Sequence, residues 1–333
     1  MVAGAARSLL RSEPLSCGCF FSQKFEAQVQ RALATESYDV IFVYCSSMAQ
    51  YVPWPSATPV VMDFVDIDSA KWSQYAKRSR LPLSWVYQRE ARTLAAHEEK
   101  WARVNSSTMV TTRQEAAFLR GEGIPPVEIV SNGVEIPAAG DVKLTEEIRN
   151  LQPFALFVGT MDYRPNIDAV EYFAEEILPR IRERHPELKF LIVGRNPTRR
   201  VRKLGRKPGI VVTGTVPEVE AYLAGCTAVV APFRIAQGIQ NKVLEALAAD
   251  KPIVSTPGPA AAIAAKQGET LLVADNAEDF ANAVVALLED PALYRRFSNG
   301  ADFVRKNFSW HENLNHLEQL LLQAAGSCLA TTR

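Results

Sequence analysis

Short apolar runs alternate with amphipathic helical stretches along almost the whole chain. In the first part, the runs that predict strands are residues 38–45, 58–66, 107–112 and 127–133. A long polar and aromatic helical stretch, broken at residues 80–82, separates the second of these strands from the third. This alternation is typical of parallel sheets covered by helices, so the pattern predicts an α/β fold.

The second part of the chain repeats this pattern more regularly. Its apolar runs predict strands at residues 154–160, 188–194, 209–216, 228–233, 252–257 and 270–274. Asn276 is placed to cap the helix that follows the last of them. The second part therefore predicts a complete doubly wound unit, whereas the four strands of the first part predict an incomplete one. The run 135–147 has the composition of a connector.

Composition limits the class of protein. The 333 residues are 47% hydrophobic and include 37 basic and 37 acidic side chains, which cancel to zero formal charge. That length allows two domains of about 150 residues each. A neutral chain does not favour nucleic acid as the main partner. We interpret the basic side chains between residues 195 and 207 as a solvated surface loop.

The cysteines and the apolar runs bear on the compartment. The five cysteines are Cys17, Cys19, Cys45, Cys226 and Cys328. They are scattered and form no CxxC pair, so we expect reduced thiols rather than disulfides or a zinc site. No uninterrupted apolar run reaches the roughly 18 residues of a membrane-spanning helix, and the N-terminus lacks a signal-peptide core. These features favour a cytoplasmic enzyme.

The segment AVVAPFRIAQGIQNKVLEALAADKPIVSTP, residues 228–257, joins two apolar runs through a predicted helix. We expect the first turn of this helix to carry Gly238, Gln240, Asn241 and Lys242, with Glu245 one turn further along. Helix N-termini at the carboxyl ends of parallel strands attract anions, and a carboxylate nearby suits a ribose diol. Each residue taken singly is more often a cap or a surface residue, but the combination favours a nucleotide diphosphate.

Several stretches resemble one known family. RIAQGIQNKVLEALAADKPIVSTP resembles the donor-site motif of the retaining GT-B glycosyltransferases of family 4, in particular the sugar transferases associated with the exosortase/PEP-CTERM system. MDFVDIDSAKWSQYA at residues 62–76 matches the signature of that subgroup. VSNGVEIP at residues 130–137 and LFVGTMDYRPNIDAVEYFAEEILPRI at residues 156–181 agree with the family pattern.

The resemblance implies a GT-B architecture, in which two Rossmann-like doubly wound domains face a cleft. Residues 1–140 would form the acceptor domain, the first and incomplete one, and residues 141–308 the donor domain. A helix within residues 309–333 would cross back to the first domain. The chain begins two or three strand–helix units later than the family's first domain, so we expect a truncated or unusually small N-terminal domain.

The activity that the resemblance implies is transfer of a sugar, with retention, from a UDP- or GDP-linked donor to a glycan or lipid-linked acceptor. It implies exopolysaccharide or cell-surface glycan synthesis, in the cytoplasm or at the inner face of the cell membrane. It also implies that no metal and no other cofactor is required. The alternative is a non-catalytic nucleotide-sugar-binding remnant. A nucleotide-sugar epimerase on the same architecture is less favoured, and a nicotinamide enzyme is disfavoured because no GxGxxG follows a predicted strand.

The donor-binding residues that the resemblance implies are Gly159, Arg164, Thr213, Arg234, Gln237, Gly238, Gln240, Asn241, Lys242 and Glu245. Glu245 would hold the ribose, and Arg234 and Lys242 would neutralise the leaving diphosphate, which makes Lys242 catalytic. The strand end at residues 213–216 would line the base pocket. Gln237 stands where the broader family has a glutamate, and Thr160 stands where it has an arginine.

The first domain offers aspartates where many relatives use a histidine near a strand end. These are Asp63, Asp66 and Asp68. We assign Asp66 and Asp68 a catalytic role, because carboxylates there could orient the acceptor hydroxyl or take its proton. The alternative is that Asp66 and Asp68, with Ser69, cap the following helix.

Overall fold

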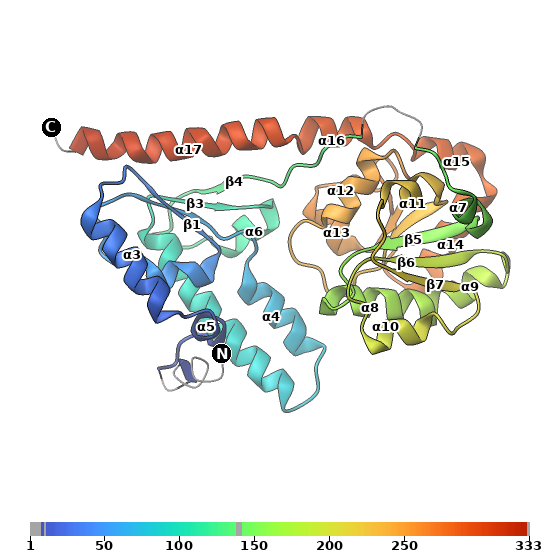
Figure 1. Ribbon diagram of the computed structural model, residues 1–333, viewed down its shortest axis with the longest axis horizontal. Helices are drawn as coiled ribbons and strands as arrows, with labels where there is room; N and C mark the ends of the chain where they lie inside the picture. The colour runs from blue at the N-terminus through green and yellow to red at the C-terminus, as the bar shows by residue number, and fades with distance from the viewer. Residues whose placement is uncertain (1–7, 10, 138–141, 332–333) are drawn as a thin grey trace. The chain divides into compact units, whose positions relative to one another are not determined.

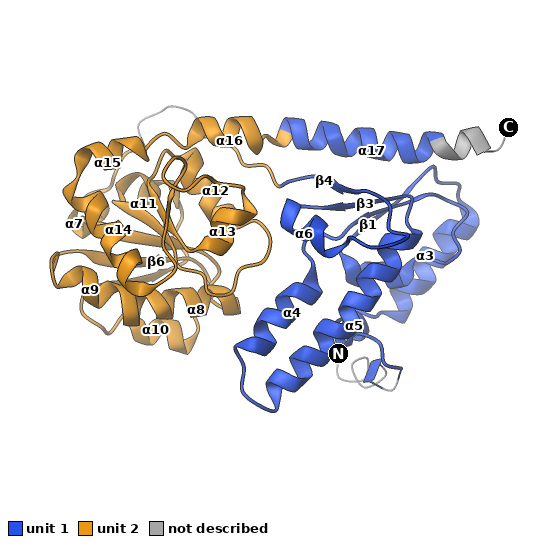
Figure 2. Ribbon diagram, turned by 180° about the vertical axis from the view of Figure 1, so that it is seen from behind, with its two compact units in different colours: residues 1–131, 311–333 blue, residues 132–310 orange. Residues whose placement is uncertain are grey.

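The computed structural model describes residues 8–9, 11–137 and 142–331, with side chains described up to residue 326 (Figure 1). It divides into two compact units. The first comprises residues 1–131 and 311–333, and the second comprises residues 132–310 (Figure 2). The boundaries expected from the sequence at residues 140 and 308 stay a prediction about separate domains.

The first unit contains a four-stranded parallel sheet. Its strands are β1 (Ile41–Tyr44), β2 (Val60–Asp63), β3 (Ser107–Val110) and β4 (Val127–Ile129), in that order across the sheet. All four lie within the predicted apolar runs, so the prediction of these strands is confirmed. That the sheet is incomplete stays a prediction.

Helices cover both faces of this sheet. They are α2 (Leu15–Cys19), α3 (Gln23–Thr35), the 3-10 helix η1 (Ser46–Tyr51), α4 (Asp68–Lys77), α5 (Leu83–Val104), α6 (Arg113–Phe118) and α17 (Trp310–Thr331). Successive residues of a strand point to opposite faces. Met62 of β2 packs in one buried cluster with Trp101 of α5, and Val61 packs in another with Ala324 of α17. Both faces are therefore buried along the central strands β2 and β3, as is typical of parallel sheets.

Strand β1 forms one edge of this sheet, and among the described residues it pairs only with β2. Its Phe42 and Tyr44 are 41% and 60% exposed. Together with Phe25 of α3 they border a hollow of about 660 Å³.

The second unit contains a six-stranded parallel sheet. Its strands are β5 (Phe154–Val158), β6 (Lys189–Val193), β7 (Ile210–Gly214), β8 (Ala228–Ala231), β9 (Ile253–Ser255) and β10 (Leu272–Val273). Their order across the sheet is β10-β9-β8-β5-β6-β7. Each strand lies in a predicted run. The central strand β5 is apolar on both faces because both are covered, and residues Phe154 to Phe157 are fully buried.

The helices of the second unit are α7 (Glu146–Leu151), α8 (Arg164–Tyr172), the π-helical turn η2 (Phe173–Ile177), α9 (Leu178–Arg182), α10 (Arg199–Leu204), α11 (Glu220–Gly225), α12 (Asn241–Ala248), α13 (Pro257–Ala262), α14 (Ala277–Glu289), α15 (Pro291–Arg296) and α16 (Ala301–Asn307). Figure 1 shows α8 and α10 below strands β5 to β7, and α11 and α12 above them. This unit is the doubly wound fold that the sequence predicts, and the α/β prediction is confirmed.

The start of α14 agrees with the sequence prediction, whereas helix α10 was not predicted. The cap of α14 is confirmed, because Asn276 Oδ1 accepts a hydrogen bond of 2.9 Å from the amide of Asp279. The basic segment after residue 195 is not a loop throughout, which corrects our interpretation. Residues Arg199–Leu204 form α10, because Thr198 caps them and Val201 and Leu204 are buried on one face of the helix.

The topology fixes where a ligand can bind in this unit. The chain runs outward from β5 through β6 to β7, and then returns to the other side of β5 to form β8. The order of strands therefore reverses between β5 and β8. In open parallel sheets, ligands bind outside the carboxyl ends of the strands at such a reversal.

Candidate functional site

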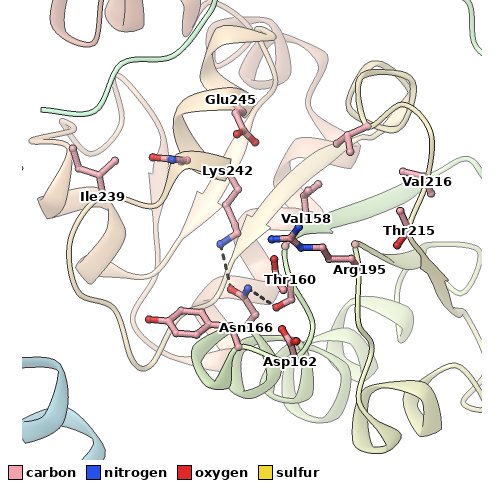
Figure 3. Close-up of a pocket in the computed structure, with 15 residues that line it drawn as sticks. Val158, Thr160, Asp162, Asn166, Arg195, Thr215, Val216, Ile239, Lys242 and Glu245 are labelled. Carbon is pink, nitrogen blue, oxygen red and sulfur yellow. Dashed lines mark hydrogen bonds between the residues drawn. The ribbon is translucent and has the colours of Figure 1, made fainter. Parts of the chain in front are cut away.

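A pocket of about 800 Å³ opens at the carboxyl ends of β5, β6 and β7, beside the first turns of α12 (Figure 3). The residues that line it are Val158, Gly159, Thr160, Asp162, Tyr163, Asn166, Gly194, Arg195, Thr215, Val216, Val219, Ile239, Asn241, Lys242 and Glu245. Small-molecule sites typically occupy about 300 to 1,000 Å³. The pocket is therefore large enough for a nucleotide-sized ligand.

Two glycines bring the ends of β5 and β6 into direct backbone contact. The amide of Gly159 donates to Val193 O at 3.0 Å. A Cβ on Gly194 would lie 1.8 Å from Gly159 O, and Gly194 has a φ of 146°. Glycine is thus required at position 194, because any side chain would push the two strand ends apart. This close contact leaves backbone rather than side chains at this part of the pocket.

Lys242 supplies a cation on the α12 side. Its Nζ donates to Asn166 Oδ1 at 3.2 Å and to Gln240 Oε1 at 3.4 Å. The ammonium also lies 4.8 Å from the ring centroid of Phe233 and 5.5 Å from that of Phe157. Burial against these groups lowers the pKa of Lys242 to about 8, although the Glu245 carboxylate opposes the shift. A poorly solvated cation beside a pocket favours an anionic ligand.

Asn166 holds Lys242 from the opposite wall. Its side chain is 3% exposed and stands in the first turn of α8. The Nδ2 group donates to Thr160 O at 2.9 Å, and Oδ1 accepts from Lys242 (Figure 3). A Cβ on Gly159 would lie 2.8 Å from Asn166 Nδ2. The amide therefore fills the space that the absent side chain of Gly159 leaves.

Glu245 and Asn241 place polar groups on the pocket side of α12. They are one helical turn apart, as the spacing predicts, and both line the pocket. Asn241 Oδ1 accepts a hydrogen bond of 2.8 Å from Asn132 Nδ2. Burial raises the pKa of Glu245, while the positive charge of Lys242 opposes the rise. A carboxylate in this position can accept hydrogen bonds from two neighbouring hydroxyl groups.

The structure brings part of the predicted donor-binding set together at this pocket. Gly159, Asn241, Lys242 and Glu245 line it. The other members lie outside the lining and are Arg164, Thr213, Arg234, Gln237, Gly238 and Gln240. Thr213 belongs to β7, and the residues that follow it, Thr215 and Val216, contact the pocket instead. Gln240 contributes indirectly, as an acceptor for Lys242.

Arg234 is bound by carboxylates of helix α8 and the π-helical turn. It donates to both oxygens of Asp168, at 2.7 and 3.1 Å, and to Glu176 Oε1 at 3.5 Å. Its guanidinium also lies 4.6 Å from the ring centroid of Tyr172. These contacts direct Arg234 to the surface of α8, and its predicted role as a phosphate ligand stays a prediction.

The start of α12 corrects a second expectation. Gly238 and Gln240 are not in the first turn, because the helix begins at Asn241. Gln240 has an extended conformation, with φ −92° and ψ 98°, and Gly238 has a φ of 64°. The residues before Asn241 therefore form a loop, in which only Ile239 contacts the pocket.

The predicted catalytic aspartates lie in the first unit, at the carboxyl end of β2. Burial, together with the charge of Glu115, raises the pKa of Asp66 to about 7. Asp68 pairs with Lys71. Their catalytic role stays a prediction.

The alternative role of these aspartates, as helix caps, is wrong. The N-cap of α4 is Ile67, which offers no capping side chain. Instead, the amide of Ile67 donates to Glu115 Oε1 at 3.2 Å, and that of Ser69 donates to Glu98 Oε1 at 3.1 Å. Glutamates from α6 and α5 satisfy these amides, so the aspartates are not needed as caps.

The polar residues of the pocket that were not among the predicted donor-binding residues include Asp162, Tyr163, Asn166 and Arg195. A signal for Arg195 was present. Val193 and Gly194 repeat the strand-end pattern of Val158 and Gly159, and a charged residue directly after such a strand end is well placed for a ligand. For Asn166 the sequence gives no signal, because its contacts depend on Lys242, 76 positions away.

Part of the second unit matches a known protein family. Residues 152–290, which include every strand of the second sheet, match the model of the family described as glycosyl transferases group 1. This match covers the pocket and supports a glycosyltransferase.

Solved structures agree in fold. The chain resembles a sucrose-phosphate synthase from Thermosynechococcus elongatus, with a TM-score of 0.73 and 19% identity over 91% of this chain and 78% of that one. It also resembles Anabaena HepE solved with UDP and glucose, with a TM-score of 0.65 and 15% identity over 90% and 81% of the two chains. A trehalose 6-phosphate synthase from Burkholderia multivorans gives a TM-score of 0.66 at 13% identity, over 92% and 75%. These neighbours confirm the GT-B type of α/β fold.

Three expectations about metals, thiols and membranes can be compared with the structure. Among the described residues, His, Cys, Asp and Glu side chains form no group of three or more that could hold a metal ion. The prediction that no metal is required is not tested by this. Cys17, Cys19, Cys45 and Cys226 are free, and the side chain of Cys328 lies outside the described residues. None of the described helices is long and apolar enough to cross a bilayer.

Proposed function

We propose that the protein is a glycosyltransferase that binds a UDP- or GDP-linked sugar in the pocket of the second unit. The observation that carries this proposal is that Lys242 and Glu245 of α12 both line the pocket at the strand reversal between β5 and β8. Lys242 suits a diphosphate and Glu245 suits a ribose diol. The family match over this segment and the UDP bound to a structural neighbour agree with that ligand.

In this proposal the residues of the pocket contact different parts of the donor. The Lys242 ammonium stabilises the negative charge that develops on the diphosphate as the glycosidic bond breaks. Arg195 lines the same pocket and can add a second positive charge, a role that the sequence analysis gave to Arg234. The absence of a side chain at Gly159 leaves room for the Asn166 amide and for the Lys242 side chain, which supplies the positive charge. Thr215 and Val216 form the wall proposed for the base.

The proposal also covers the acceptor, the stereochemistry of transfer and the cellular location. The sugar moves to a glycan or lipid-linked acceptor with retention of anomeric configuration, without a required metal, in exopolysaccharide or cell-surface glycan synthesis. Asp66 and Asp68 orient the acceptor hydroxyl. The protein works in the cytoplasm or at the inner face of the cell membrane. The resemblance of residues 62–76 to the transferase subgroup supports these points.

The first test is calorimetric binding of UDP, GDP and their common sugar conjugates, followed by donor turnover with a membrane extract as acceptor. Binding with turnover, and a product whose anomeric configuration matches the donor by NMR, would support the whole proposal. Binding without turnover would favour a non-catalytic nucleotide-sugar-binding protein. Release of an altered sugar nucleotide without acceptor would favour an epimerase.

Substitution of Glu245 tests where the nucleotide binds. Glu245→Ala removes the proposed ribose contacts and should weaken nucleotide binding by about 1 to 3 kcal/mol, the usual range for hydrogen bonds to a charged group. Glu289→Ala is the matched control, because this carboxylate lies in the same unit, pairs with Arg184 and is outside the pocket. Equal affinities of the Glu245→Ala and wild-type proteins would place the nucleotide elsewhere.

A further inference from the structure

The Asn166 side chain is oriented without ambiguity. A lysine ammonium can only donate and a backbone carbonyl can only accept. With Lys242 on one side and Thr160 O on the other, the amide oxygen must face Lys242 and the amide nitrogen must face Thr160. A flipped amide would oppose donor to donor and acceptor to acceptor. Both the oxygen and the nitrogen of this nearly buried amide therefore form hydrogen bonds.

Lys242 depends on this amide more than on any ion pair. In the parts of the chain that the structure describes, no carboxylate lies within 4.0 Å of its ammonium. Its hydrogen-bond acceptors are Asn166 at 3.2 Å and Gln240 at 3.4 Å, and the shorter contact comes from α8 across the pocket wall. The ammonium also contacts the Phe157 and Phe233 rings, whose cation–π attraction replaces only part of the solvation that it loses.

We propose that Asn166 is a positioning residue that fixes Lys242 at the pocket and keeps its amine charged through the Oδ1 contact. This inference rests on the proposed function, because the charge of Lys242 matters there for the diphosphate. Thr160 has a part in it, since its carbonyl holds the amide of Asn166 in the required orientation. The contact thus joins the loop after β5, the start of α8 and the start of α12.

The charged groups around Lys242 determine how its protonation responds to this contact. Glu245 on α12 favours the charged amine, and Asp162 and Arg195, from the loops after β5 and β6, line the same pocket. Burial beside the Phe157 and Phe233 rings removes water and so opposes the charge, and the cation–π contacts with these rings offset part of that loss. Because burial already lowers the pKa of Lys242 to about 8, loss of one acceptor would change its charge in the neutral range.

The experiment measures the protonation of Lys242 directly, in the full chain without nucleotide. The ¹³Cε resonance of Lys242 is followed against pH in protein labelled at lysine, and it is assigned with Lys242→Arg. Asn166→Leu removes the acceptor, so the pKa of Lys242 should fall. Asn166→Asp replaces the acceptor with a carboxylate of nearly equal size, so the pKa should rise towards that of an ordinary lysine.

Affinity gives the second readout. Both variants should weaken binding of UDP or GDP, whichever the wild-type protein binds, by about tenfold at pH 7. The pH at which binding is lost should move down in Asn166→Leu and up in Asn166→Asp. A purely structural role would weaken binding without opposite shifts. Asn276→Ala is the matched control, because it removes an asparagine that caps α14 outside the pocket, and it should change thermal stability alone.

The outcomes separate the two proposals. Opposite shifts of the Lys242 pKa support the positioning role even if no nucleotide binds, and absence of binding by the wild-type protein would instead overturn the proposed function. A Lys242 pKa that is the same in Asn166→Asp and wild type would overturn the positioning role. If Asn166→Leu does not fold, Asn166→Asp still decides the question, because it keeps the size of the side chain and an acceptor for Lys242, although it loses the hydrogen bond to Thr160 O.

Discussion

At the scale of single residues, the central feature is Lys242, whose ammonium is poorly solvated beside the pocket. The ammonium of Lys242 contacts two amide oxygens and two aromatic rings. Charge in such a place is destabilising in the absence of a ligand, and it is retained where function needs it. Function and stability should therefore oppose each other at this position.

Replacement of Lys242 by methionine should make that opposition measurable. Burial lowers the pKa of Lys242 from 10.5 to about 8. The folded protein thus binds this proton less tightly than the unfolded chain, and the penalty is fully present below pH 8 and disappears as the pH approaches 10.5. Allowing for partial exposure, we expect Lys242→Met to raise the free energy of unfolding at pH 7 by on the order of 1 to 2 kcal/mol.

Urea unfolding at pH 7, 9 and 10.5 tests this sign, since 10.5 is the ordinary lysine pKa. The gain should shrink as the pH rises. Lys266→Met is the control, because that lysine is 75% exposed and its loss should change stability by less than about 0.5 kcal/mol. A gain that does not depend on pH would show that packing, rather than charge, is responsible.

Residue identities in the site could be predicted from the sequence only where the partners are close along the chain. Lys242 and Glu245 could be predicted to lie at the pocket because they are close together on one helix between two strands. The contacts of Arg234 with Asp168 and those of Asn166 with Lys242 could not be found, because they join residues 66 and 76 positions apart. Which charges are already paired is a property of the tertiary structure.

At the scale of elements, the strands could be predicted and the exact helix starts could not. A strand covered on both faces must be apolar throughout, as in FALFV of β5, so the pattern alone identifies it. A helix start depends on which groups satisfy its first amides. Asn276 does this locally and was predicted. At α4, Glu98 and Glu115 do it from other helices, and no local pattern shows this.

The contact between the ends of β5 and β6 gives a prediction at this scale. Gly194→Ala places a Cβ 1.8 Å from Gly159 O at a φ that side chains rarely adopt, so the two loops must separate. We expect a loss of about 2 to 4 kcal/mol in the free energy of unfolding, and weaker nucleotide binding. Chemical denaturation and calorimetry provide the two measurements.

Gly326→Ala provides the comparison for this substitution. Gly326 lies in α17 and has open space around its would-be Cβ. Alanine there should stabilise the helix by about 0.5 to 1 kcal/mol. If both alanine variants were equally stable, the close approach of Gly194 to Gly159 would not limit the fold.

At the scale of the whole molecule, the chain forms two units, and the second includes the segment matched by the glycosyltransferase family. The sequence predicted two α/β parts because the pattern of strands and helices occurs twice. The family resemblance led us to expect that a helix within residues 309–333 crosses back to the first domain, and in the structure residues 311–333 group with the first unit. Val61 and Met109 of the first sheet contact Leu321 and Ala324 of α17.

Leu321→Asp should therefore destabilise the first unit although it changes the end of the chain. A carboxylate buried against Val61 and Met109 should cost about 2 to 4 kcal/mol. Tryptophan fluorescence during denaturation suits the measurement, because four of the five tryptophans lie in this unit, namely Trp54, Trp72, Trp85 and Trp101. The neighbouring Leu322 is 65% exposed, so Leu322→Asp should have little effect. Equal effects of the two would mean that α17 does not pack as described.

The edge of the first sheet has a consequence for the protein in solution. Strand β1 pairs only with β2 among the described residues, and its Phe42 and Tyr44 side chains are exposed on one face of the sheet. Unpaired strand edges with apolar neighbours are templates for pairing with another chain. The tendency of the protein to self-associate at high concentration will therefore depend on this edge rather than on the pocket of the second unit.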